Sequence, residues 1–69
     1  MMRDVQMLTN LDLLHRTITL HTVFGANDNT RTRLLQVASE LTGKKPATLT
    51  AALEQIEFEI ARLRGEVRQ

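Results

Sequence analysis

The sequence predicts a small all-α or mainly α protein with two to three helices, a long C-terminal helix, and an intertwined homodimer as its assembly. Three observations lead to this prediction: an apolar stripe with heptad spacing near the C-terminus, two glycine-containing helix boundaries, and a length of 69 residues without cysteine. A chain of this length forms one domain, residues 1–69, which buries only about 60% of the surface that its unfolded form exposes. Because no disulfide can add stability, we expect self-association to do so.

The first segment, which ends at Gly25, has two interpretations. In the first interpretation it is a helix in which Thr9-Asn10-Leu11-Asp12 provides the cap and an acidic residue in the first turn, and which ends at Gly25. Residues 1–7 are then a loose tail or a short helical lead-in. As a short N-terminal β-ribbon, residues 16–21 alternate polar with apolar side chains and are rich in β-branched residues. The sequence leaves both alternatives open for residues 16–24.

The second segment is predicted to be a helix over residues 30–42. Asp28, Asn29 or Thr30 can cap its first amides, and Gly43 suits the left-handed residue that follows a helix end. Its apolar face consists of Leu34, Leu35, Val37, Ala38 and Leu41. This periodic face and the two boundary signals together indicate a helix.

The third helix is predicted to begin near residues 46–48 and to run to about Gly65 or beyond. Pro46 is tolerated in a first turn, and Thr48 or Thr50 can cap it. Its apolar side chains are spaced alternately four and three residues apart; this C-terminal stripe consists of Leu49, Leu53, Ile56, Ile60, Leu63 and Val67. One helix cannot cover such a stripe by itself, so we predict that the stripe forms the dimer interface.

Two further observations bear on this interface. The C-terminal stripe could instead face the other helices of the same chain. Phe58 lies opposite the stripe, which gives the helix two apolar faces and favours a central position in a dimer. A single exposed phenylalanine is the alternative.

The residues that carry most enzymatic chemistry are missing or poorly placed. His15 and His21 are six residues apart, on different faces of a helix, and neither has a partner at a spacing that marks a nucleophile or a metal site. The three glycines stand alone, so no phosphate-binding loop is predicted. We therefore expect no enzymatic activity, no metal and no cofactor.

The apolar stretch from Leu8 to Leu20 is interrupted by Asp12, His15 and Arg16. It therefore resembles neither a signal peptide nor a membrane helix, and we expect a soluble, cytoplasmic protein without a membrane partner. With only Phe24 and Phe58 as aromatic residues, stacking on single-stranded nucleic acid is not expected.

The formal net charge is only +1, but basic residues gather in the middle of the chain. Between residues 31 and 45, Arg31, Arg33, Lys44 and Lys45 are opposed by the single acid Glu40. This local excess is compatible with phosphate contacts to nucleic acid. The alternative is a solvated helix face followed by a lysine-containing turn.

Two parts of the chain resemble known DNA-binding families. The run Val37-Ala38-Ser39-Glu40-Leu41-Thr42-Gly43-Lys44-Lys45-Pro46-Ala47-Thr48-Leu49-Thr50-Ala51-Ala52-Leu53 resembles the helix-turn-helix core of small bacterial and phage repressors. It also resembles the two helices of ribbon-helix-helix repressors, and Arg16-Thr17-Ile18-Thr19-Leu20 resembles their DNA-reading ribbon. This second resemblance implies that Arg16, Thr17, Thr19 and His21 enter the major groove, while Lys44, Lys45 and the amides near Thr48 hold phosphate.

Two functional hypotheses follow. The first is a small homodimeric DNA-binding transcriptional regulator, whose candidate DNA-binding residues are Arg16, Thr17, Thr19, His21, Arg31, Arg33, Lys44, Lys45 and Thr48. The second is a small helical protein–protein interaction module without DNA binding. Such a module would be an adaptor, inhibitor or assembly factor, of the kind that phage and mobile-element genes encode, and would present a helix face to a larger protein.

Overall fold

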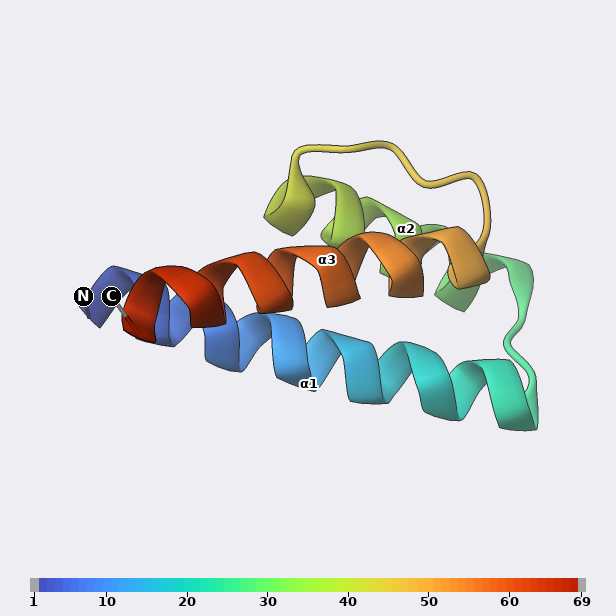
Figure 1. Ribbon diagram of the computed structural model, residues 1–69. Coiled ribbons are helices and arrows are strands. Elements are labelled where there is room, and N and C mark those ends of the chain that lie inside the picture. The colour runs from blue at the N-terminus through green and yellow to red at the C-terminus, as the bar shows by residue number, and fades with distance from the viewer. Residues whose placement is uncertain (1, 69) are drawn as a thin grey trace.

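The protein is a bundle of three helices: α1 (Met2–Phe24), α2 (Asp28–Thr42) and α3 (Leu49–Arg68) (Figure 1). The structure is a computed structural model that describes the backbone of residues 2–68 and the side chains of residues 4–65. No strand occurs within that part of the chain, which confirms the mainly α prediction. α2 and α3 both run antiparallel to α1, and residues 43–48 cross back along the length of α2 to connect them (Figure 1).

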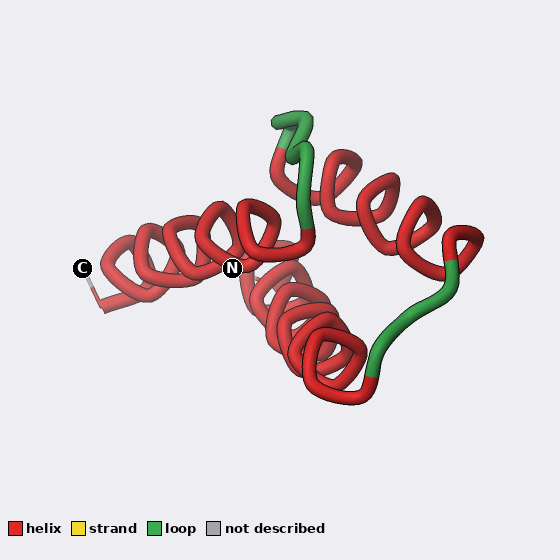
Figure 2. Tube along the Cα trace, turned by 90° about the vertical axis from the view of Figure 1, so that its right-hand side faces the viewer, coloured by secondary structure: helices red, strands yellow, loops and turns green. Residues whose placement is uncertain are grey.

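The core lies where the three helices meet. α3 makes its most extensive contact with α1 and also packs against α2. Viewed from the end, the helix axes are inclined to one another, and the two connections lie at opposite ends of α2 (Figure 2). The buried side chains are Leu11, Leu14 and Ile18 of α1, Leu34 and Ala38 of α2, and Ala52, Ile56, Ile60 and Leu63 of α3.

Residues 16–24, for which strand and helix were both open, lie in α1. The helix buries Leu11, Leu14 and Ile18 at three- and four-residue spacing, and this burial outweighs the poor helix propensity of the threonines between them. The Thr17 and Thr19 hydroxyls each donate a 2.8 Å hydrogen bond to the carbonyl four residues earlier. The hydroxyl groups of both threonines therefore have hydrogen-bond partners within the helix.

The predicted start of the first helix was wrong. The sequence placed a cap at Thr9–Asp12, but α1 already begins at Met2, so the helical lead-in was the better interpretation. The Thr9 hydroxyl donates to the carbonyl of Val5 at 3.0 Å, inside the helix. A threonine can thus appear as a cap in the sequence while bonding to the preceding turn.

The ends of α2 and α3 follow their capping residues closely. Asn27, one residue before the predicted candidates, caps α2, with its Oδ1 accepting from the Thr30 amide at 2.8 Å. Gly43 adopts φ 74°, which confirms the predicted left-handed end. Thr48 caps α3 through a 3.1 Å hydrogen bond from the Ala51 amide, whereas Pro46 lies in the connection before the helix.

Candidate functional site

The C-terminal stripe is covered by the other helices of the same chain. Ile56, Ile60 and Leu63 are buried against α1 and α2, while Leu49 and Leu53 pack at the edge of the core. Ala52, which the stripe omitted, is also fully buried on this face. Val67 lies outside the residues whose side chains are described. The C-terminal stripe is therefore covered by helices of its own chain. Its role as an interface between two copies stays a prediction.

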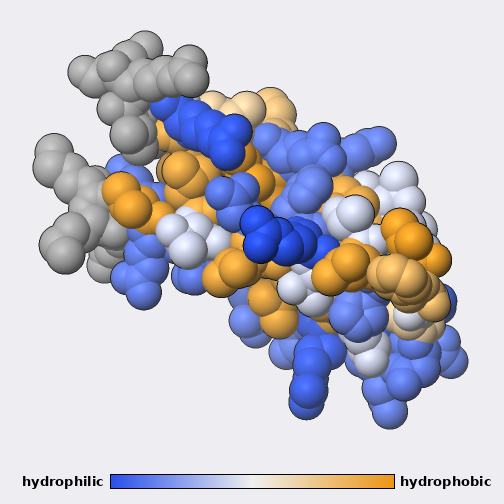
Figure 3. Space-filling view, turned by 90° about the horizontal axis from the view of Figure 1, so that it is seen from below, coloured by the Kyte–Doolittle hydropathy of each residue, from blue (hydrophilic) through white to orange (hydrophobic). Residues whose placement is uncertain are grey.

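A second apolar stripe lies on the solvent side of α1. Leu13, Thr17, Leu20 and Phe24 recur at helical spacing and share one face, which we call the outer stripe. Leu13, Leu20 and Phe24 are 55%, 50% and 80% exposed. Figure 3 views the molecule from the α1 side and shows apolar residues at the surface, several of them toward the end away from the termini. α1 is therefore apolar on two sides, of which only the inner one is covered within the chain.

An open groove of about 330 Å³ runs beside the outer stripe, between α1 and α2. Leu13, Leu14 and Thr17 line it from α1, and Val37 and Leu41 line it from α2. The remaining lining residue is Asn10, so the described residues around the groove carry no charge. An uncharged, largely apolar groove next to an exposed apolar stripe can receive the side chains of another helix.

Three candidate DNA-binding residues meet at one end of the bundle. His21, Arg31 and Thr48 border an open hollow of about 440 Å³, where α1 ends and α2 and α3 begin. The Thr48 hydroxyl caps the Ala51 amide, and the amides before it have no carbonyl partner within the helix, so this corner offers chemistry that can hold an anion. The Arg31 guanidinium, however, already lies 3.4 Å from the Asp28 carboxylate and donates to the Ala26 carbonyl.

The α1 candidates do not extend this corner. Arg16 and Thr19 border a separate hollow between α1 and α3, which also contains the carboxylate of Asp12 and the guanidinium of Arg64. Thr17 lines the groove toward α2 instead. Since these positions lie on a helix rather than a ribbon, they do not project together from one strand face.

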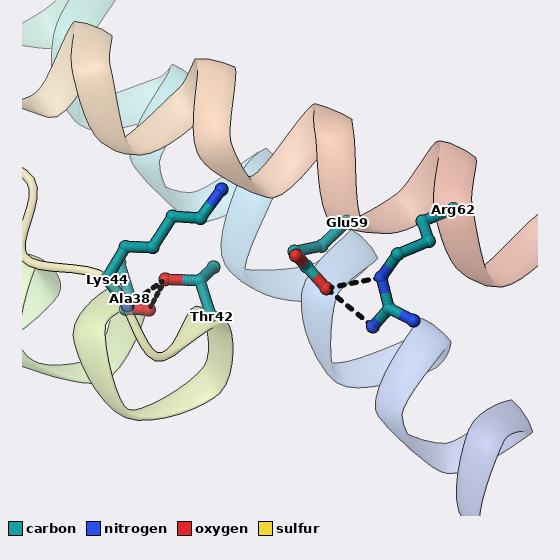
Figure 4. Close-up of polar contacts among 5 residues, drawn as sticks. All are labelled: Ala38, Thr42, Lys44, Glu59 and Arg62. Atoms are coloured by element: carbon teal, nitrogen blue, oxygen red, sulfur yellow. Dashed lines mark hydrogen bonds and ion pairs between the residues drawn. The ribbon is translucent and has the colours of Figure 1, made fainter.

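The α2 and loop candidates are also dispersed. Arg33 lies beside Thr32 and Gln36 on the exposed side of α2. The ammonium of Lys44 lies 4.9 Å from the ring centroid of Phe58, an arrangement that favours a cation–π contact. Figure 4 shows the Lys44 side chain extending toward α3, away from the Thr42 hydroxyl, which donates to the Ala38 carbonyl. Arg16, Arg31, Arg33 and Lys44 therefore form no single continuous face.

Two polar contacts join α1 to α3 near the surface. His15 Nε2 lies 3.0 Å from Glu57 Oε2, and Arg64 Nη2 lies 3.9 Å from Asp12 Oδ2. The His15 and Glu57 side chains are 33% and 61% exposed, so water screens this pair. These contacts help to set how α1 lies along α3.

The outer stripe and the groove were missed by the sequence analysis. The signal was present as the four, three, four spacing from Leu13 through Thr17 and Leu20 to Phe24. It was obscured because Leu11, Leu14 and Ile18 follow the same period on the inner face, which makes the segment look apolar over most of its circumference.

Comparison of the chain with protein-family models, curated proteins and solved structures finds no match. Within residues 2–68, no helix has the length and apolar character needed to cross a bilayer.

Proposed function

We propose that this protein is a small helical protein–protein interaction module whose working surface is the outer stripe of α1. The observation that carries this proposal is the double amphipathicity of α1: its inner face fills the core, while Leu13, Leu20 and Phe24 stay exposed on the other. A helix whose apolar surface extends well beyond the face turned to its own core is normally covered there as well. We therefore expect another protein to cover the exposed side chains of the outer stripe.

The chemistry of the surface supports a helix as the covering element. The outer stripe repeats at heptad spacing, and the groove beside it runs between two helices and is lined by Leu13, Val37 and Leu41. This is the geometry that receives the apolar face of an amphipathic helix at positions i, i+3, i+4 and i+7.

The test is site-specific photocrosslinking in the cells that make the protein. A benzophenone amino acid in place of Leu20 is expected to trap a protein covalently. The same group in place of Phe58, which is 61% exposed on α3, serves as the matched control and is expected to trap much less. Equal trapping at both positions, or none at Leu20, would contradict the proposal.

DNA binding is the second candidate function, and the corner formed by His21, Arg31 and Thr48 favours it. We propose that such binding would use this corner as a phosphate contact, because the start of α3 and the guanidinium of Arg31 both favour anions. Anisotropy of a labelled random duplex measures it. Binding that weakens steeply with salt and is reduced by Arg31→Gln would support it, and no binding at low salt would exclude it.

A further inference from the structure

We propose that the occupant of the outer stripe is a second copy of this chain, packed antiparallel across a two-fold axis that passes beside Thr17 and Val37. This inference rests on the proposed function, because it names the protein that the outer stripe binds. It differs from an interface built on the C-terminal stripe, since Ile56, Ile60 and Leu63 stay in the core of each copy.

The accessible surface area of the single chain supports a second copy as the partner. The accessible area is 5155 Å², whereas a compact monomer of this mass exposes about 4400 Å². The excess of about 750 Å² is close to the roughly 800 Å² that each partner buries in a standard interface. The molecule is elongated, with extents of 40 × 20 × 17 Å, and pairing along its length makes it more compact.

The apolar residues of α1 are arranged symmetrically for this pairing. Leu13 and Leu20 lie on the same face at equal sequence distances from the midpoint between residues 16 and 17. A two-fold axis at that point places Leu13 of each copy against Leu20 of the other, so the same pair occurs twice in the dimer. The exposed Phe24 then lies toward the Asn10 end of the neighbouring α1, which borders the groove.

The charges of α2 are arranged symmetrically about the same place. Arg33, Val37 and Glu40 share a face of α2, and the midpoint between Arg33 and Glu40 falls beside Val37. Val37 and Thr17 line the same groove, so the midpoints on α1 and α2 lie next to each other. The axis that pairs Leu13 with Leu20 therefore also brings Arg33 of one copy opposite Glu40 of the other. Two independent sets of residues thus agree on one self-complementary arrangement.

The test is the molar mass of the purified chain by light scattering and sedimentation, with far-UV circular dichroism to verify folding. The wild type is expected at twice 7.8 kDa and Leu20→Glu at 7.8 kDa. Phe58→Glu, which changes an exposed apolar residue on α3, is the matched control and is expected to stay dimeric. Because Leu20 is half exposed, its replacement by Glu is expected to leave the helix content unchanged.

A charge exchange tests the position of the axis. Glu40→Arg alone places Arg33 opposite a second arginine and is expected to raise the dimer dissociation constant about tenfold, because like charges then meet twice. The double variant Arg33→Glu with Glu40→Arg restores opposite charges and is expected to recover the wild-type constant. If the double variant stays as weak as the single one, the proposed axis is wrong.

The remaining outcomes separate this inference from the proposed function. A wild-type chain that is monomeric even at millimolar concentration overturns the second copy as occupant, yet leaves the interaction module intact if photocrosslinking at Leu20 traps a different protein. A dimer that Phe58→Glu disrupts and Leu20→Glu does not would overturn the inference by moving the contact to α3.

Discussion

Gly43 and Gly65 are two exposed glycines in different backbone conformations. Gly43 ends α2 with φ 74°, a conformation that costs a residue with a side chain about 1 kcal/mol or more. Gly65 lies inside α3, where glycine is about 0.8–1.0 kcal/mol less favourable than alanine. An added Cβ meets no atom within 4 Å at either position, so only the backbone conformation decides the outcome.

We therefore predict opposite effects for the same substitution. Gly43→Ala is expected to lower the free energy of unfolding by about 1 kcal/mol, and Gly65→Ala to raise it by about 0.5–1 kcal/mol. Urea unfolding followed by circular dichroism measures both. Each variant is the control for the other, and a loss of stability in both would contradict the helical placement of Gly65.

A second residue-scale prediction concerns the inner and outer faces of α1. Ile18 is fully buried among all three helices, so Ile18→Ala is expected to cost about 2–5 kcal/mol through lost burial and the cavity left behind. Val5 is 55% exposed on the same helix, and Val5→Ala is expected to change stability by less than about 0.5 kcal/mol. Chemical denaturation distinguishes the two, and equal losses would mean that the core is placed incorrectly.

At the scale of elements, α2 and α3 could be predicted from the sequence and α1 only in part. Gly43 and Thr48 mark helix ends through local chemistry, which a sequence displays directly. The conformation of residues 16–24 depends instead on Ile18 joining the core cluster that includes residues of α2 and α3, a tertiary arrangement that the sequence does not display. For the same reason the C-terminal stripe revealed an apolar face but not which helix covers it. The corner joining His21, Arg31 and Thr48 also depends on these tertiary contacts.

The threonines of α1 lead to an element-scale prediction. Thr19 is exposed, and its hydroxyl bonds only to the His15 carbonyl four residues earlier. Because alanine has the higher helix propensity and such back-bonding slightly weakens a helix, Thr19→Ala is expected to stabilise the protein by about 0.5 kcal/mol. Thermal unfolding measures the gain. A lower melting temperature would show that the hydroxyl bond contributes more than the helix propensity of alanine.

At the scale of the whole molecule, the folding of so small a bundle is expected to depend on its concentration. The core is a single cluster of mostly aliphatic side chains, and the second apolar side of α1 adds to it only when a partner covers that side. A ligand that binds only the folded state raises apparent stability by mass action, and a second copy acts in the same way. The proposed dimer therefore links association to folding.

This linkage gives a prediction that needs no knowledge of the interface. If unfolding and dissociation occur together, each tenfold rise in chain concentration stabilises the folded chain by about 0.7 kcal/mol, half of the 1.4 kcal/mol per dimer, and raises the melting temperature by about 3–5 °C. Calorimetry over a hundredfold concentration range measures the shift. Leu20→Glu, which removes the apolar side chain from the outer stripe, is expected to melt at a temperature that does not change with concentration. A wild-type melting temperature that is equally constant would mean that the folded chain binds no second copy over this concentration range, and it would contradict the proposed dimer.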